Sequence, residues 1–297
     1  MNKVKIITDS CSDLTEELLK KYDIDYVKMN TVFEGKTSPA LLEWTAEDVH
    51  AFYEIMRSGK RITTTQVPVD EFQTVFTKYL AQGMDIVYIA CSSKQSGSVN
   101  TASVLANKLK ETYPDNKIIC IDSLNSSFSL GMLAMEAAKL AAMGKSVDEV
   151  AEWVINNKKN VHEFCTVHSL DALHRAGRVK ASAAFFGNLM GVKPIIVSDY
   201  NGEQAAFKKV KGRLNSMKEI VALLKEALIN SESQTIYLTH ADCSKEEVDL
   251  LANMIKEQIP CKDVYIGYIG PIIGASIGPD AVSIYGFGKP VTFNKGE

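Results

Sequence analysis

The sequence predicts a two-domain α/β protein in which a parallel sheet covered by helices is followed by an α/β domain with a mixed sheet. The chain has 297 residues and is 46% hydrophobic, and this length exceeds that at which a single core usually divides. In the first half, short β-branched runs alternate with amphipathic stretches, whereas the second half is less regular. We therefore expect domains at 1–160 and 161–297, with the boundary in the polar stretch 156–160.

The first half contains the alternation of strands and helices that is typical of a parallel sheet. The expected strands are 4–8, 86–90 and 118–121, and the expected helices are 14–22, 99–112 and 129–143, with a further helix that begins near residue 70. Pro114 ends the helix 99–112. Ser146 and Glu149 form a capping box that opens one more helix, because the hydroxyl and the carboxylate satisfy each other's free amide groups.

The second half predicts more strands than helices. The expected strands are 164–167, 193–197, 205–210, 235–239, 264–269 and 281–287, and the expected helices lie near 181–190, 215–230 and 244–258. Residues 199–202 between two of these strands predict a hairpin turn, since Asn201-Gly202 can adopt positive φ. A mixed sheet with helices on one face fits this order.

Composition and charge exclude several classes of function. The chain carries 33 basic and 36 acidic residues, a formal charge of −3, without the basic block that a nucleic acid partner would need. No apolar stretch is long enough for a signal peptide or a membrane span, so we expect a cytoplasmic protein. The six cysteines and five histidines lack metal-ligand spacing, so we expect neither a metal site nor a cofactor. Because heptads are absent, we expect a monomer.

Hydroxyl side chains follow the expected strands, at the sheet edge where ligands of parallel sheets bind. These hydroxyl-rich stretches are 8–10, 92–98 and 122–123, and a further hydroxyl run, 63–66, is expected in a loop before the helix that begins near residue 70. We expect Ser10, Ser12 and Ser123 to cap helices. Ser96 and Gly97 differ, because a glycine where a loop enters a helix lets the backbone approach a ligand and directs free amide groups at an anion. From the residues alone, a cap and a ligand site are equally open there.

A singly charged carboxylate fits this anion site better than a nucleotide does. The chain lacks both phosphate-binding glycine patterns, G-x-x-x-x-G-K-[ST] and G-x-G-x-x-G. Arg178, which follows the helix-breaking Gly177, could bind a carboxylate with two parallel hydrogen bonds or could form an ordinary salt bridge. The apolar run 183–190 could line a pocket or belong to the core.

Short motifs are spread along almost the whole chain in a specific order. They are 7–10 with 13–14, 64–66 with 71–72, 92–93 with 96–97, 122–123, 176–178 with 187–189 and 193–194, 199 with 202, 211–213, and 270–275 with 278–279. In this order and at these distances the chain resembles the DegV family, which includes the fatty-acid-binding subunits of bacterial fatty acid kinase. The resemblance implies a Rossmann-like first domain, an α/β second domain, and a fatty acid buried between or within them.

The resemblance also implies which groups hold the fatty acid. Thr64, or with less support Thr65, and Ser96 would bind the carboxylate, the Gly97 amide would add a hydrogen bond, and Arg178 would support this network. The predicted carboxylate set also includes Ser276, and the predicted acyl pocket consists of Phe185, Phe186, Leu189 and Ile273.

The chain departs from the family pattern near its C-terminal end. Ser276 and Asp280 stand where family members active with the kinase often have histidine and glycine. The loss of an imidazole donor weakens the case for a kinase partner more than the case for acyl binding.

The sequence thus predicts a long-chain fatty-acid carrier that is not an enzyme. An ATP-dependent fatty acid kinase subunit is a possible partner, and a transient membrane contact is compatible with this role. Two alternatives stay open: a carrier of another amphipathic carboxylate, and a serine hydrolase with Ser96 as nucleophile, for which a G-x-S-x-G motif and a suitably placed histidine are missing.

Overall fold

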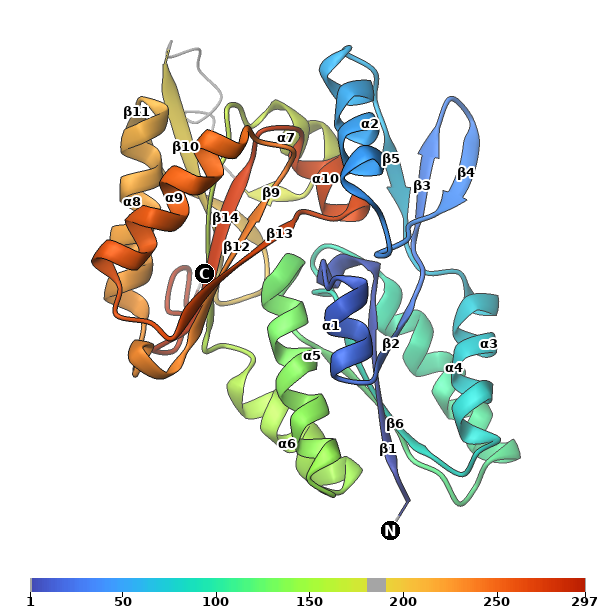
Figure 1. The fold of residues 1–297 in the computed structure, drawn as a ribbon. Coiled ribbons are helices and arrows are strands. Elements are labelled where there is room, and N and C mark those ends of the chain that lie inside the picture. The colour runs from blue at the N-terminus through green and yellow to red at the C-terminus, as the bar shows by residue number, and fades with distance from the viewer. Residues whose placement is uncertain (1, 181–190, 297) are drawn as a thin grey trace. The chain divides into compact units, whose positions relative to one another are not determined.

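A computed structural model describes residues 2–180 and 191–296 (Figure 1). Two compact units make up the chain. Unit 1 comprises Met1–Glu43 and Thr64–Lys158, and unit 2 comprises Trp44–Thr63 and Lys159–Glu297. These units differ from the predicted domains 1–160 and 161–297 chiefly because residues 44–63, within the first half of the sequence, belong to unit 2.

Unit 1 contains the parallel sheet that the sequence predicts. Its strands are β1 (Val4–Asp9), β2 (Ile24–Val27), β6 (Asp85–Ala90) and β7 (Ile118–Asp122). They are arranged in the order β2-β1-β6-β7, and all three neighbouring pairs are parallel. Every residue of the central strand β6 is buried, which explains why this strand is an almost continuous apolar run.

Helices cover both faces of this sheet. They are α1 (Glu16–Lys21), α3 (Val69–Leu80), α4 (Ser98–Thr112), α5 (Ser127–Ala142) and α6 (Val147–Asn157), together with the short 3-10 turn Ser10–Ser12. The pair α3 and α4 lies on one face, and the pair α5 and α6 lies on the other (Figure 1). The capping box of α6 is confirmed: Ser146 Oγ accepts from Glu149 N at 3.2 Å, and Glu149 Oε2 accepts from Ser146 N at 2.8 Å.

The sequence analysis did not predict the elements between residues 24 and 65. Besides β2, these are β3 (Asn30–Phe33), β4 (Lys36–Pro39), α2 (Ala46–Arg57) and β5 (Thr63–Thr65). The strands β4, β3 and β5 form a separate three-stranded sheet in that order. They are short and none of their residues is fully buried, so they lack the apolar runs that identify buried strands.

Unit 2 contains a mixed seven-stranded sheet in the order β13-β12-β14-β8-β10-β11-β9. Its strands are β8 (Val161–Thr166), β9 (Val179–Lys180), β10 (Val192–Ser198), β11 (Gln204–Lys211), β12 (Thr235–His240), β13 (Asp263–Tyr268) and β14 (Val282–Phe287). The predicted hairpin is confirmed: β10 and β11 pair antiparallel, and Gly202 has φ +84° and donates to Asp199 O at 3.1 Å.

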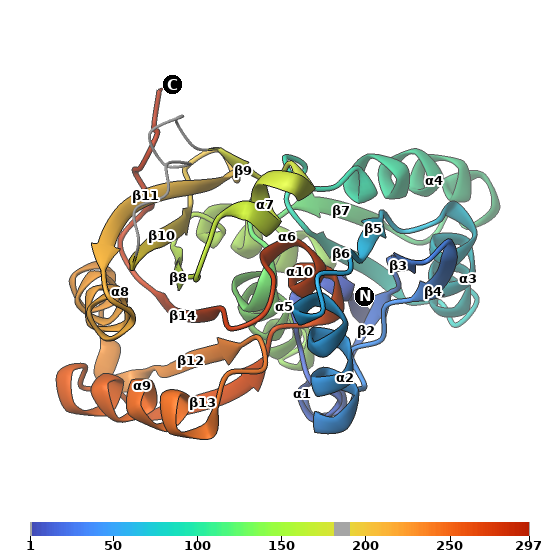
Figure 2. The same ribbon diagram turned by 90° about the horizontal axis from the view of Figure 1, so that it is seen from above.

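The helices of unit 2 are α2, α7 (Asp171–Ala176), α8 (Arg213–Ala227), α9 (Lys245–Gln258) and α10 (Pro271–Ile277), with a 3-10 turn at Ser231–Ser233. Helices α8 and α9 pack together, and their apolar residues join the sheet in one buried cluster (Figure 2). A second cluster contains residues of α2, α7 and α10. The helix predicted at 181–190 lies outside the described residues. Among the helices that are described, none is both long and apolar enough to cross a membrane.

Candidate functional site

Two of the predicted binding segments, 64–66 and 96–98, lie against each other in unit 1. The backbone N–H of Val67 donates to Ser98 Oγ at 3.2 Å, and Gln66 Nε2 donates to Thr101 Oγ1 at 3.1 Å. Thr101 lies in the first turn of α4. The threonine segment of β5 is therefore held beside the loop that enters α4, although about thirty residues of sequence separate the two.

The hydroxyl of Ser96 is oriented by its neighbours. Ser96 Oγ lies 2.9 Å from Ser98 Oγ and accepts from the Ser98 N–H at 3.3 Å. Ser98 is fully buried and its Oγ already accepts from Val67 N, so the Ser98 proton is best placed on Ser96 Oγ. Ser96 then accepts two hydrogen bonds, and its own O–H points to no acceptor among the described residues. A half-buried hydroxyl in this state is a donor available to an anion.

Gly97 is the N-cap residue of α4, and within the described chain no side chain caps this helix. The first-turn amide groups and the dipole of α4 therefore favour negative charge at the N-terminal end of this helix. Gly97 has φ −78°, so the glycine is not needed for its backbone conformation. A Cβ there would lie 2.3 Å from Gln66 Oε1, so the flexible end of the Gln66 side chain would have to move. A larger residue at position 97 would thus disturb the contact between Gln66 and the start of α4.

The two candidate threonines differ in their surroundings. The Thr64 side chain is half-buried, and its hydroxyl has no hydrogen bond to the described part of the chain. Thr65 is exposed, and its Oγ1 accepts a long bond of 3.4 Å from Asn30 Nδ2. Thr64 is therefore the better placed of the two to bind a partly enclosed ligand.

Other polar groups at the carboxyl edge of the parallel sheet are used within the protein. Ser10 Oγ donates to Ala40 O at 2.9 Å. Asp9 accepts from the backbone N–H groups of Cys11 and Cys91 at 3.0 and 2.9 Å and from Tyr88 Oη at 3.0 Å. Burial raises the pKa of Asp9 to about 6 against these hydrogen bonds. Sequence reasoning did not identify this carboxylate, which joins the ends of β1 and β6.

Arg178 lies in unit 2, directly after α7. Gly177 ends this helix with φ +68°, as the sequence predicts, and the N–H of Arg178 donates to Leu173 O at 3.2 Å. The exposed guanidinium donates through Nη1 to Ala176 O at 2.6 Å. This bond fixes the side chain at the C-terminal end of α7, where a positive charge is favourable.

Helix α10 carries the remaining predicted residues that the structure describes. Ser276 is half-buried, and its Oγ lies 3.5 Å from Ile272 O in the same helix. Ile273 is partly buried and packs against the core cluster of α2 and α7. The other predicted pocket residues, Phe185, Phe186 and Leu189, lie outside the described residues.

Comparison with known proteins identifies the family. A family model described as "Uncharacterised protein, DegV family" matches residues 3–288. The chain belongs to the DegV family. A DegV domain-containing protein of Clostridium perfringens is 36% identical over 293 residues, which cover 97% of this chain and 98% of the relative. A second such protein of the same organism is 32% identical and covers 95% of this chain and 97% of its own length.

Two solved structures from Thermotoga maritima share the DegV fold with this chain. One is described as a DegV lipid-binding protein; it is 26% identical, with a TM-score of 0.84 over 98% of this chain and 100% of its own. The other is described as revealing a fatty-acid-binding function; it is 25% identical, with a TM-score of 0.82 over 96% and 99% of the two chains. The α/β fold with a parallel and a mixed sheet is therefore that of the DegV family.

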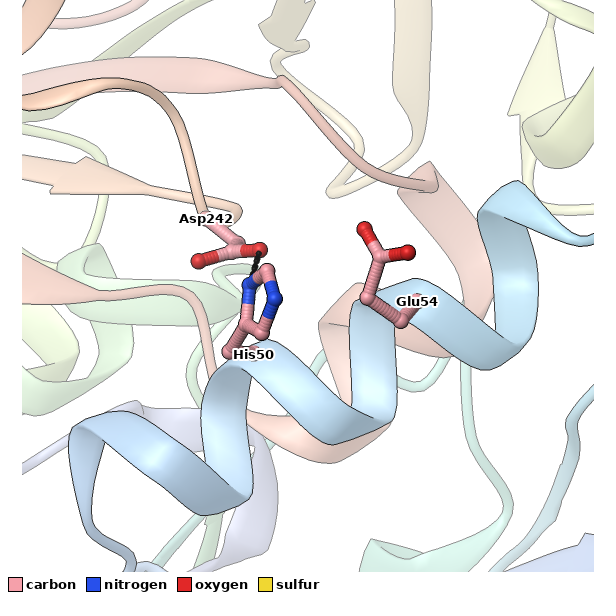
Figure 3. Close-up of side chains that lie close together, drawn as sticks. All are labelled: His50, Glu54 and Asp242. Atoms are coloured by element: carbon pink, nitrogen blue, oxygen red, sulfur yellow. Dashed lines mark hydrogen bonds and ion pairs between the residues drawn. The ribbon is translucent and has the colours of Figure 1, made fainter.

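This DegV chain also brings together three potential metal ligands in unit 2: His50, Glu54 and Asp242 (Figure 3). Their ligand atoms lie within 4.8 Å of one another, and His50 Nδ1 is 2.9 Å from Asp242 Oδ2. However, Arg57 Nη1 donates to Glu54 Oε1 at 2.9 Å and to the same Asp242 oxygen at 2.6 Å. Because the Arg57 guanidinium already pairs with both carboxylates and would repel a metal ion, the cluster serves to attach α2 within unit 2.

Proposed function

We propose that this protein is a long-chain fatty-acid carrier and not an enzyme. The observation that supports this most is the junction of β5 with the uncapped start of α4, where the free hydroxyl of Ser96 and the open amide of Gly97 lie beside the Thr64 segment. The two Thermotoga maritima proteins, described as lipid-binding and as revealing a fatty-acid-binding function, have the same fold and family.

The donors at this junction suit a single carboxylate. Ser96, Thr64 and the Gly97 N–H are neutral donors, so they bind one negative charge without the metal ion or the several cations that a polyphosphate needs. Each hydrogen bond to a charged group contributes about 1.5–3 kcal/mol. Burial of a chain of roughly sixteen carbons contributes on the order of 10 kcal/mol before losses. The tail therefore supplies most of the affinity, and the head group mainly sets orientation.

The residues of unit 2 enter this proposal through the family resemblance. Arg178 and Ser276 are proposed to support the carboxylate, and Phe185, Phe186, Leu189 and Ile273 to line the acyl pocket. We expect Arg178→Ala to weaken binding modestly, because the hydrocarbon tail dominates. Phe186→Asp places a charge against the tail and should weaken binding severely.

Displacement of a fluorescent fatty acid tests the proposal. Ser96→Ala should reduce affinity by about tenfold to a hundredfold, the loss of one charge-assisted hydrogen bond of about 1.5–3 kcal/mol. Ser103→Ala is the matched control, since Ser103 lies on the same helix, donates to Val99 O at 2.8 Å and belongs to none of the proposed binding segments. Near-zero effects of Ser96→Ala, Arg178→Ala and Phe186→Asp alike would contradict the proposed site.

Mass spectrometry of gently purified protein tests the ligand itself. A co-purified long-chain fatty acid supports the carrier function, whereas an empty protein that takes up no added fatty acid would rule it out. A competition series over chain length and head group separates a fatty acid from another amphipathic carboxylate.

Two further parts of the proposal concern catalysis and partners. The neighbour that orients Ser96 is Ser98 and not a histidine, which favours a binding role over hydrolysis. Labelling of Ser96 by a serine-directed phosphonate would instead indicate a hydrolase. We also propose that the protein delivers the carboxylate to an ATP-dependent kinase subunit. If the family's imidazole takes part in this step, Ser276→His should strengthen the delivery.

A further inference from the structure

The two faces of the sheet in unit 2 differ in chemistry. Phe164, Ile195 and Val282 belong to the buried cluster that the sheet forms with α8 and α9. Because side chains alternate between the two faces along a strand, the residues between these point to the other side. There, Cys165 and Ile196 belong to the second cluster, which includes residues of α2, α7 and α10 (Figure 2). The second face is therefore the one that carries the candidate residues of α7 and α10.

One row of side chains on this second face is apolar. Antiparallel pairing aligns Ile196 with Cys165 on one side and with Ala206 on the other. Cys165 and Ile196 are fully buried, and Ala206 is partly buried against the same cluster. Ile273, the described member of the predicted acyl pocket, packs against this cluster as well. An acyl chain bound beside Ile273 therefore lies toward this apolar row.

The next row on the same face is polar and consists of Glu163, Ser198 and Gln204. Each of them lies two residues from a member of the apolar row, about 7 Å along its strand. Ser198 Oγ donates to Glu163 Oε2 at 2.8 Å. Gln204 Nε2 donates to the same oxygen at 3.1 Å and to Ser198 Oγ at 2.8 Å. These hydrogen bonds join β8, β10 and β11, and none of the three residues is more than 7% exposed.

Glu163 is a carboxyl group that is buried without a cation. Its other oxygen, Oε1, lies 3.5 Å from Ser283 Oγ, and no basic side chain of the described residues pairs with it. Burial raises the pKa of Glu163 against the hydrogen bonds from Ser198, Gln204 and Ser283, which favours the neutral acid. Displacing any member of this network would leave buried polar groups without partners. The polar row is thus a fixed boundary that a hydrocarbon chain cannot push aside.

The candidate head-group residues of unit 2 lie toward the opposite end of strand β8. This strand leads into α7 and then to Arg178, and Leu173 of α7 belongs to the second cluster together with Val167. From Val167 back to Glu163 the chain spans roughly 13 Å at 3.3 Å per residue. A fatty acid whose carboxylate is supported by Arg178 therefore directs its methyl end along the apolar row toward Glu163.

We propose that the polar row of Glu163, Ser198 and Gln204 determines specificity by limiting the length of the acyl chain that the protein accepts. This inference rests on the proposed carrier function and names the residues that select among its ligands. Each methylene buried against the apolar cluster raises affinity about fourfold. A methyl group that reaches the polar row gains no further apolar contact and meets groups that stay hydrogen-bonded to one another. Affinity therefore stops rising at the chain length that reaches this row.

Displacement of a fluorescent fatty acid by saturated acids of increasing length measures this limit in the full-length protein. Glu163→Ala removes most of the side chain at the centre of the row, and the limiting length should increase by about two carbons. Ala206→Leu fills space in the apolar row, and the limiting length should decrease by about two carbons. Ala206 is only partly buried, so the larger side chain can be accommodated, and this variant decides the question alone if Glu163→Ala does not fold.

Two variants serve as matched controls. Glu163→Gln keeps the size and polarity of the side chain, so the limiting length should not change. Ile195→Ala removes buried volume from β10, but on the face that packs against α8. It should lower stability and leave the limiting length as it is.

The outcomes separate this inference from the proposed carrier function. If the wild-type protein binds fatty acids but the limiting length is the same in Glu163→Ala and Ala206→Leu, the polar row does not set it. The inference is also overturned if Ile195→Ala moves the limit as far as Glu163→Ala does. If the wild-type protein displaces no probe with an acid of any length, the carrier function itself fails.

Discussion

Replacement of Ser98 by alanine tests how the start of α4 is linked to the threonine segment. Ser98 is fully buried, and its Oγ accepts the N–H of Val67 at 3.2 Å while lying 2.9 Å from Ser96 Oγ. Val67 is also fully buried. Ser98→Ala removes the acceptor, and water cannot easily replace it, so the Val67 N–H is left without a partner inside the protein.

The size of the effect follows from these contacts. A buried donor that loses its partner costs about 1–3 kcal/mol. We therefore expect the free energy of unfolding of unit 1 to fall by about 2 kcal/mol, a large part of the stability of a typical domain. Ser96 also loses the donor that orients its hydroxyl, so fatty-acid affinity should fall by about threefold to tenfold.

Urea unfolding followed by circular dichroism measures the stability, and hydrogen exchange of the Val67 amide measures the local bond. Ser98→Thr keeps the hydroxyl and should retain most of both. Ser103→Ala is the control on the same helix: its bond to Val99 O is partly buried but joins residues of one helix turn, and little change is expected. If Ser98→Ala unfolds like Ser103→Ala and the Val67 amide exchanges at its original rate, the reasoning about this hydroxyl pair is wrong.

Three further substitutions probe packing, backbone strain and burial of charge. Gly274→Ala places a Cβ 2.5 Å from Tyr53 Oη and should lower the free energy of unfolding by about 1–3 kcal/mol; unchanged urea unfolding would refute this close packing of α10 on α2. Asp280 has φ +62° and pairs with Arg57. Asp280→Gly relieves about 1 kcal/mol of backbone strain and loses an ion pair of about 0.5 kcal/mol, so thermal stability should change only slightly. A loss of stability above about 2 kcal/mol would show that the ion pair dominates. Burial raises the pKa of Asp9 from its ordinary 3.8 to about 6, so the folded state binds this proton more tightly than the unfolded state does. Stability should therefore fall by about 3 kcal/mol as pH rises from about 4 to 6, and Asp9→Asn should lack this slope; a slope that persists in Asp9→Asn would assign it to other groups.

Some of the fold was predictable because it depends on neighbours in the sequence. The capping box of Ser146 and Glu149 joins residues three positions apart, and the Asn201-Gly202 turn needs only local backbone freedom. The apolar run of β6 likewise identifies a buried strand by itself. The family motifs, read in order, predicted the DegV family to which the chain belongs.

The short elements between residues 24 and 65 were missed for the opposite reason. The strands β3, β4 and β5 contain no fully buried residue and lack an apolar pattern. Helix α2 joins unit 2 through Arg57, which binds Asp242 across 185 residues of sequence, and through Tyr53, whose Oη donates to Ile269 O at 2.7 Å. Local pattern contains no information on such pairs.

The candidate sites divide in the same way. Sequence alone left a helix cap and an anion site equally open at Ser96 and Gly97, and the family resemblance named the threonines as their partners. Only the tertiary structure showed that the Val67 N–H and Ser98 orient the Ser96 hydroxyl. Spacing along the chain determines caps, turns and periodic faces, whereas the direction of a hydroxyl proton or the charge balance of a cluster depends on groups that only folding brings together.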